Sequence, residues 1–196
     1  MTTNKLRGRG RPRTFDPAEA VASARILFHA RGYDAVSVSD MTTMLGINPP
    51  SFYAAFGSKI SLFKRVLDYW AGSGAIPMES ILRPDRPVSL SLAVLLEEAA
   101  RHYASDPSAA GCLVLENTRC DDKDAREAAL SFNVAAEDAI REYIALRHPE
   151  NADCVADFVS TTMSGLSAKA RNGHGLDQLL ASARLAAIAL KGLLPH

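Results

Sequence analysis

Apolar residues recur with helical spacing along most of the chain, beginning with residues 17–31. The apolar stripe of this first segment consists of Ala20, Val21, Ala24, Leu27 and Phe28. Asp16 suits the N-cap of such a helix, Pro17 its first position and Gly32 a C-cap with positive φ. Helical spacing continues through the rest of the chain, so the sequence predicts an all-α fold.

Two short helices separated by three residues follow. Ser37 and Asp40 have the spacing of a capping box, and the helix that they begin ends at Gly46. Asn48 and Pro49 suit the cap and first position of the next helix. This arrangement is typical of a helix-turn-helix, whose second helix lies in the DNA major groove. The apolar residues expected to hold the pair in place are Met41, Leu45, Ile47, Phe52 and Phe56.

A longer helix is expected to run from about Lys59 to Trp70. Residues 71–87 are rich in Gly, Pro and Ser, and we interpret them as a connection rather than a domain boundary, because the preceding helix is expected to belong to both parts. Further helices are expected at 88–105, 110–119, 122–147, 151–171 and 176–193, which makes about nine in all.

The net charge of zero hides an asymmetry along the chain. Residues 1–70 contain ten basic and five acidic side chains, a net charge of +5, and the remainder carries −5. Four arginines fall within residues 6–13, LRGRGRPR. A basic head on an acidic body indicates a polyanionic partner for the head, because clustered Lys and Arg release counterions from phosphates.

The stretch from Phe15 to Trp70 resembles the N-terminal DNA-binding domain of the TetR family of bacterial transcriptional regulators. The matching residues are Gly32-Tyr33, the run from Ser37 to Met41, Leu45-Gly46-Ile47, the run from Ser51 to Lys59, and Leu62-Phe63. The resemblance implies an all-α homodimer with a three-helix head and a larger helical body that binds an effector. It divides the chain into a flexible basic arm (1–14), a helix-turn-helix head (15–70) and an effector-binding and dimerisation body (71–196).

The resemblance also implies which residues contact DNA. Position by position, the family's contacts fall on Ser37, Ser39, Pro49, Pro50, Ser51, Tyr53, Ala54, Ala55 and Lys59. Consecutive prolines, and two alanines where larger side chains often occur, depart from the family's usual pattern. Alanine can touch a thymine methyl group but cannot read donors and acceptors, so the basis of sequence specificity stays open.

The arginine-rich segment offers a second mode of DNA binding. Arg9-Gly10-Arg11-Pro12 is similar to the core of an AT-hook, and Arg13 follows it. Glycine lets the backbone approach the groove floor, proline favours an extended chain, and arginine favours the negative potential of a narrow A·T-rich minor groove. The alternative is a disordered tail that only adds solubility.

The last two predicted helices indicate a dimer interface. The segment LLASARLAAIALKGLL is apolar nearly all round, which is typical of a helix buried on all sides. A partner subunit would supply that cover, while burial within one chain is the alternative. The residues assigned to this interface are Phe158, Thr162, Gly165, Leu166, Leu179, Ala183, Ala187 and Leu190.

Aromatic, polar and sulfur-containing residues of the body are candidates for an effector pocket, the alternative being that they are ordinary core or surface residues. They are Trp70, Tyr103, Cys112, Asn117, Phe132, Asn133 and Met163. Asp106-Pro107 and Gly111-Cys112-Leu113 also resemble the bodies of one TetR subgroup.

Other chemistry has little support in the sequence. The three cysteines, Cys112, Cys120 and Cys154, and five histidines show no metal-ligand spacing, so no metal or cofactor is expected. The cysteines are interpreted as free thiols, with a thiol switch as the alternative. Cys112 and Cys120 are expected to lie about 12 Å apart along one helix, too far for a disulfide.

The sequence thus predicts a cytoplasmic, dimeric repressor that binds a palindromic operator and responds to a small-molecule effector. A basic N-terminus without a following apolar segment, and the lack of a membrane-spanning run, favour the cytosol. Two other classes stay open. An architectural binder would use the arginine arm on A·T-rich DNA without a palindrome, and an all-α enzyme would need converging catalytic groups, for which we find no motif.

Overall fold

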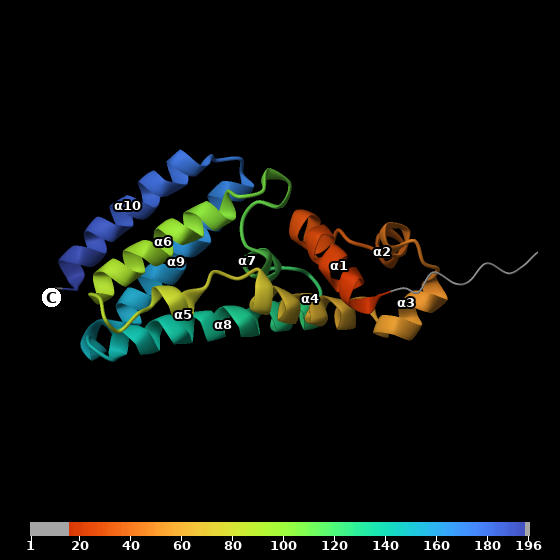
Figure 1. Ribbon diagram of the computed structural model, residues 1–196, viewed down its shortest axis with the longest axis horizontal. Helices are drawn as coiled ribbons and strands as arrows, with labels where there is room; N and C mark the ends of the chain where they lie inside the picture. Colours follow the sequence, from red (N-terminus) through yellow and green to blue (C-terminus); the bar gives the residue numbers. More distant parts are fainter. Residues whose placement is uncertain (1–15, 195–196) are drawn as a thin grey trace, which may run out of the picture.

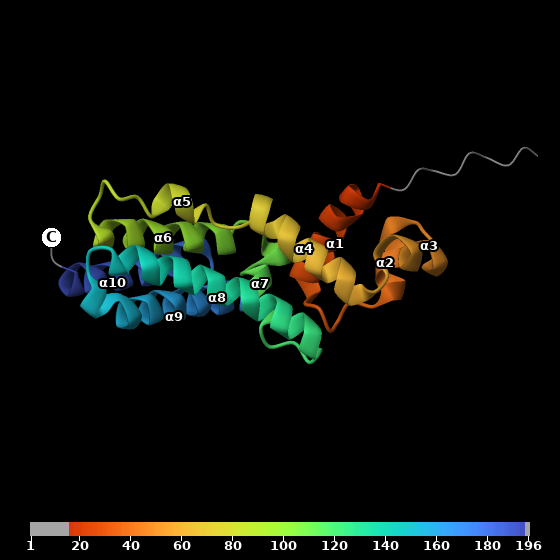
Figure 2. The same ribbon diagram turned by 90° about the horizontal axis from the view of Figure 1, so that it is seen from below.

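The computed structural model describes residues 16–194, which form helices joined by turns, with no strand in that range. Figures 1 and 2 show a head at one end of an elongated chain and a helical body at the other. The predicted all-α fold is confirmed. The head contains α1 (Pro17–Arg31), α2 (Val38–Leu45), α3 (Pro49–Phe56) and α4 (Lys59–Ser73).

Local capping explains where the helices of the head begin. The side chain of Asp16 accepts a hydrogen bond from the backbone N–H of Ala18, and Asn48 and Ser58 cap α3 and α4 in the same way. Each cap satisfies one of the backbone donors that the first turn of a helix leaves unpaired. The starts of α1 and α3 predicted from Asp16 and Asn48 are therefore confirmed.

The body consists of longer helices with short connections. They are α5 (Met78–Ile81), α6 (Val88–Tyr103), α7 (Leu113–Asn117), α8 (Lys123–Ala145), α9 (Ala152–Arg171) and α10 (Leu176–Leu193). Short 3-10 turns occupy Pro107–Ala109 and Pro149–Asn151. In Figure 1, α10 runs along α6 at the outer edge of the body, and α9 packs against α6, α8 and α10.

Three expectations for the body need correction. The helix expected at 110–119 is only α7, because Gly111 adopts a φ of 83° and Pro107 begins a separate turn. Cys112 is the N-cap residue of α7 and Cys120 lies beyond its end, so the two cysteines do not share one helix. The connection at 71–87 also contains a helix that was not predicted, α5.

One apolar core extends from the head into the body. In the head, the rings of Phe28, Tyr33 and Phe63 pack with centroids 4.9 to 5.8 Å apart. α4 packs against α1 in the head and against α8 in the body, so it contacts both parts. α4 is therefore the helix that directly joins the helix-turn-helix to the body.

Candidate nucleic-acid interface and effector cavity

The residues predicted to contact DNA lie mainly on the surface of the head. Those exposed to solvent are Ser37, Ser39, Pro49, Pro50, Ser51, Tyr53 and Ala54. Ala55 and Lys59 are half-buried, while Phe52 and Phe56 of the same helix are buried in the core. The buried Phe52 and Phe56 therefore fix the orientation of α3 and leave Ser51, Tyr53 and Ala54 exposed. At 51% exposure, Tyr53 is the largest side chain on that face.

The N-terminus of α2 is held by a complete capping box. Asp40 N–H donates to Ser37 Oγ over 3.0 Å, and the Asp40 carboxylate accepts from the backbone N–H of Ser37 over 2.7 Å. The Ser37 hydroxyl donates to the same carboxylate, and Arg31 pairs with it at 3.2 Å. These bonds from Ser37, with a smaller contribution from Arg31, lower the pKa of Asp40 to about 2.

Lys59, at the start of α4, is directed toward the protein rather than freely into solvent. Its Nζ lies 3.8 Å from the centroid of the Tyr33 ring, a cation–π contact. Partial burial lowers the pKa of Lys59, and the nearby carboxylates of Asp34 and Asp122 oppose that shift. A phosphate contact by Lys59 would therefore compete with these neighbours.

The predicted arm residues Arg9, Arg11 and Arg13 lie outside the described residues. The arm nevertheless accounts for the net positive charge of residues 1–70. Residues 16–70 contain five basic and five acidic side chains, so their formal charges cancel. The entire +5 excess of residues 1–70 belongs to residues 1–15.

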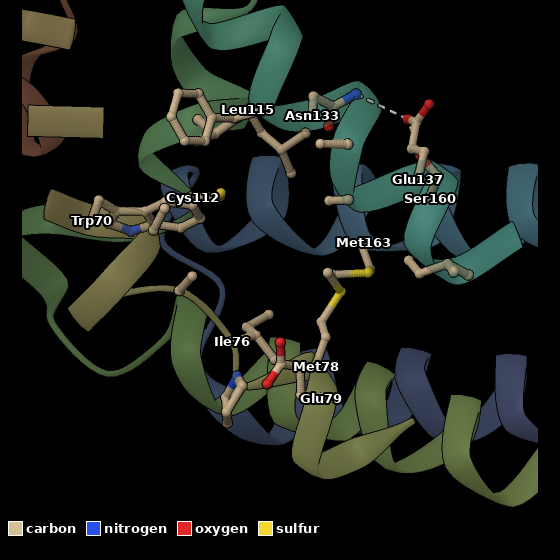
Figure 3. Close-up of a pocket in the computed structure, with 18 of the residues that line it drawn as sticks. Trp70, Ile76, Met78, Glu79, Cys112, Leu115, Asn133, Glu137, Ser160 and Met163 are labelled. Atoms are coloured by element: carbon tan, nitrogen blue, oxygen red, sulfur yellow. Dashed lines mark hydrogen bonds between the residues drawn. The ribbon is translucent and has the colours of Figure 1, made fainter. Parts of the chain in front are cut away.

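A cavity of about 780 Å³ opens in the body between α4, α5, α7, α8 and α9. Figure 3 shows residues from these helices around it. The predicted pocket residues that line it are Trp70, Tyr103, Cys112, Phe132, Asn133 and Met163. The volume falls within the range of about 300 to 1,000 Å³ that is usual for small-molecule sites. The cavity is therefore the best candidate for the effector site.

Asn117, the seventh predicted pocket residue, does not line this cavity. It is 1% exposed, and its Oδ1 accepts a 2.7 Å hydrogen bond from the backbone N–H of Tyr33 in the head. Its Nδ2 donates to the carbonyl oxygen of Leu113 within α7. Asn117 thus joins α7 to the head rather than to a ligand.

Several cavity residues were missed by sequence reasoning. Ile76, Met78 and Glu79 come from α5 and the residues just before it, a segment interpreted from sequence as a connection. Glu137 and Ser160 come from α8 and α9. Glu137 could have been predicted from its spacing on α8, because residues three and four apart share a helix face. The cavity residues on that face are Phe132, Asn133, Ala136, Glu137 and Ile140.

The cysteine of the cavity is a neutral thiol. Burial raises the pKa of Cys112, and burial also raises the pKa of the Tyr103 hydroxyl beside it. Both groups thus remain protonated near neutral pH. All three cysteines are free, and Cys154 is exposed.

Arg171, near the end of α9, links the body to the head. One guanidinium nitrogen donates to the carbonyl oxygens of His29 and Ala110, at 2.8 and 3.2 Å, and Nε pairs with Glu116 at 2.9 Å. His29 Nε2 in turn lies 3.1 Å from the carbonyl oxygen of Gly111. Head, loop, α7 and α9 therefore meet in one network of hydrogen bonds.

The residues assigned from sequence to a dimer interface fall into two groups. Leu166, Leu179, Ala183 and Leu190 are buried within the chain itself, whereas Phe158, Thr162, Gly165 and Ala187 are half-buried or exposed. The first four are core residues of this chain, because α10 packs along α6. Leu185 and Ile188, 69% and 70% exposed, are instead the most exposed large apolar residues of α10.

Within residues 16–194, no cluster of three or more His, Cys, Asp or Glu side chains is arranged to hold a metal ion. None of the helices in this range combines the length and apolar character that crossing a membrane requires.

Comparison with known proteins decides the family. Residues 20–66 match the family described as bacterial regulatory proteins, tetR family. The chain is 53% identical over 194 residues to the HTH-type transcriptional repressor BdcR of Escherichia coli, a match that covers 99% of this chain and 98% of the relative. This chain belongs to the TetR family. The resemblance noted in the sequence is thus confirmed, and the protein is a transcriptional regulator rather than an enzyme.

Two further relatives agree with this assignment. The HTH-type transcriptional repressor ComR of Escherichia coli is 29% identical over 185 residues, 89% of this chain and 88% of the relative. A cysteine-substituted TetR family regulator, CifR, solved with 26-base-pair operator DNA, is 31% identical, with a TM-score of 0.82 over 91% of this chain and 99% of that one. Because these relatives are repressors or regulators bound to operators, the architectural alternative is not favoured.

Proposed function

We propose that this TetR-family protein is a cytoplasmic dimeric repressor that binds a palindromic operator and is released from it by a small molecule. The observation that carries the proposal is the exposed face of α3, with Ser51 and Tyr53, set on a helix-turn-helix in a chain 53% identical to a repressor. Each head would place α3 in the major groove of one half-site. The two heads would lie about 34–36 Å apart, one turn of DNA, or a multiple of that distance.

Sequence recognition would be divided between the helix and the arm. Ser51 and Tyr53 can bind phosphate, and Ala54 and Ala55 can contact thymine methyl groups. Ser37, Ser39, Pro49, Pro50 and Lys59 would complete the surface on the DNA backbone. Arg9, Arg11 and Arg13 would enter the adjacent minor groove, where they would add affinity and a preference for A·T pairs.

Effector binding would act through two elements that touch both the cavity and the head. Trp70 and the residues that follow it on α4 line the cavity, while the other end of α4 packs in the head. The N-cap residue and the start of α7 also line the cavity, through Cys112, Val114 and Leu115. The end of α7 contacts the head, because the Asn117 side chain accepts a hydrogen bond from the backbone N–H of Tyr33. A ligand would tilt α4, change the separation of the heads and lower operator affinity.

The effector must bind the released conformation more tightly than the DNA-bound one, because a ligand with equal affinity for both shifts nothing. Identical head separations in effector-bound and effector-free dimers would contradict this mechanism. Spin labels on α3 of each subunit would measure the separation directly.

The dimer would form through the outer faces of α9 and α10. Leu185 and Ile188 supply exposed apolar area, and Gly165 and Ala187 permit close approach of the partner's helices. Phe158 and Thr162 on α9 would extend the contact, while the buried Leu179, Ala183, Leu166 and Leu190 would support it from within.

Selection of bound sequences from a random DNA pool tests the operator proposal. Full-length protein and a variant that begins at Thr14 would be compared. We expect both to select the same inverted repeat, and only the full-length protein to select A·T-rich flanks. Failure of both to select an inverted repeat would contradict the dimeric operator binder.

A further inference from the structure

We infer that the effector is an organic cation, a protonated amine carried on an aromatic or aliphatic body. The inference rests on the proposed effector role of the cavity and names the class of ligand. It starts from the charge of the cavity wall. Among the described residues that line the cavity, Glu79 and Glu137 are acidic, and there is no lysine, arginine or histidine.

The two carboxylates come from different sides of the cavity. Figure 3 shows Glu79 on α5, across the cavity from Glu137 on α8. Glu137 is held in place: its Oε1 accepts a hydrogen bond of 2.9 Å from Asn133 Nδ2 and another from the Ser160 hydroxyl. Glu137 is half-buried and has no cationic partner within the described residues, whereas Glu79 is exposed to solvent and makes no side-chain hydrogen bond or ion pair there. The half-buried charge of Glu137 is therefore not neutralised by any cationic side chain of the described cavity wall.

The rest of the wall suits the organic part of such a ligand. Trp70 and Phe132 offer aromatic faces, which attract cations as well as apolar groups. Figure 3 shows the side chains of Met78 and Met163 directed toward each other across the cavity. Thioether side chains are flexible and polarizable, so they adapt to the shape of an apolar body.

The charge of a ligand is therefore expected to determine how tightly it binds in the cavity. Glutamate carboxylates are negative near neutral pH, and Cys112 contributes no compensating or additional charge, because burial raises the pKa of its thiol. An anionic ligand would lose its hydration and be repelled by both carboxylates. A cation also loses hydration, but the carboxylates and aromatic faces replace it. A neutral ligand of the same shape gains only the apolar contacts.

Three probes of one shape test the inference: 4-phenylbutylamine, 4-phenylbutanol and 4-phenylbutyrate, which differ in charge at neutral pH. Trp70 is the single tryptophan of the chain and lines the cavity, so its fluorescence reports binding at this place. Calorimetry on the full-length protein would give each dissociation constant. We expect the amine to bind at least about tenfold more tightly than the other two, equivalent to about 1.4 kcal/mol.

A pair of charge-removing variants provides the control. Glu137→Gln keeps an acceptor for Asn133 and Ser160 and removes the charge, so it should abolish most of the preference for the amine and leave the alcohol unaffected. Glu142→Gln removes the same charge from an exposed position of α8 that does not line the cavity. That variant should bind like the unmodified protein.

Three results would overturn the inference: an alcohol or a carboxylate that binds as tightly as the amine, no binding of any probe at millimolar concentration, or amine binding that leaves Trp70 fluorescence unchanged. Operator binding by the same ligand-free preparation is measured in parallel. Its absence would contradict the proposed repressor function, whereas intact operator binding with the wrong charge preference would contradict only the ligand class.

Discussion

The side-chain oxygen of Asn117 accepts a hydrogen bond from the backbone N–H of Tyr33, 84 residues away along the chain. The bond is 2.7 Å long and buried, and it connects the end of α7 to the turn after α1. The start of α7 lies in the wall of the body cavity. One short helix thus reaches from the proposed effector site to the DNA-binding head.

Asn117→Ala should destabilise the protein by about 1–3 kcal/mol, because the variant leaves the Tyr33 N–H buried without an acceptor. Urea unfolding followed by circular dichroism would measure the change. Asn117→Asp keeps the acceptor oxygen, but it removes the Nδ2 donor to Leu113 and buries a negative charge, so it should destabilise the protein as well. If both variants unfold at the same urea concentration as the unmodified protein, this hydrogen bond does not hold α7 to the head.

Removing residues 1–13 should weaken operator binding and flatten its dependence on salt. The formal charges of residues 16–70 cancel, so the arm carries the net positive charge of the head. Removal of the arm should reduce the slope of log K against log salt by about 0.9 for every phosphate that the arm neutralises. Fluorescence anisotropy with operator DNA at several salt concentrations would give the slopes of both proteins.

Lysine in place of Arg7, Arg9, Arg11 and Arg13 is the matched control for charge. This variant should keep most of the salt dependence and lose much of the preference for A·T flanks, because lysine lacks the planar guanidinium. An unchanged slope after truncation would show that the arm makes no phosphate contacts.

Glutamate in place of both Leu185 and Ile188 should convert the proposed dimer to a monomer. Two charges buried in an apolar interface without partners are strongly unfavourable. Light scattering after gel filtration should show a mass near that of one chain, 21.0 kDa, for this variant. Leu146→Glu, at an exposed apolar position on the end of α8, should remain dimeric. A dimeric double variant would place the interface elsewhere.

Stability should fall as the pH is lowered below about 6.5, the ordinary pKa of histidine. Burial lowers the pKa of His29, and the positive charges of Arg171, Arg25 and His102 add to the shift. Burial also lowers the pKa of His102. The unfolded chain therefore binds more protons than the folded one below this pH, so stability is complete above about 6.5 and declines under it.

Urea unfolding at about pH 7.5 and about pH 5.5 measures this dependence. His29→Gln removes one titrating group and should reduce the difference in unfolding free energy between the two conditions. Should the variant show the full difference, the pH dependence arises from other groups.

The starts of the head helices were predictable because they depend on neighbours in sequence. Ser37 and Asp40 are three residues apart, and their capping box needs no other part of the chain. The partner of Asn117 was not predictable, because a buried asparagine in the body gives no sign that it faces a turn of the head. The pattern of α10 likewise could not reveal which side packs on α6: Leu179 and Leu185 look equivalent in sequence, yet one is 1% and the other 69% exposed.

Within the cavity, the large aromatic and sulfur-containing residues were predicted from their chemistry, whereas Met78 and Glu79 were missed. Their segment contains glycine, proline and serine, which predict a loop, and α5 is only four residues long. Such a helix has no intrinsic stability in isolation. It forms here because Ile81 is buried against the core and so fixes the segment at the cavity mouth.

The shortness of α5 has a consequence for how this fold can diversify. Met78 and Glu79 line the cavity from a segment whose buried anchor is Ile81, so substitutions at the two positions alter the cavity wall while sparing the main helix contacts. Under the proposed function, selection for a new effector can therefore act on α5 with little effect on folding or operator recognition. We expect chains that share this head and answer to different molecules to differ first in these few residues.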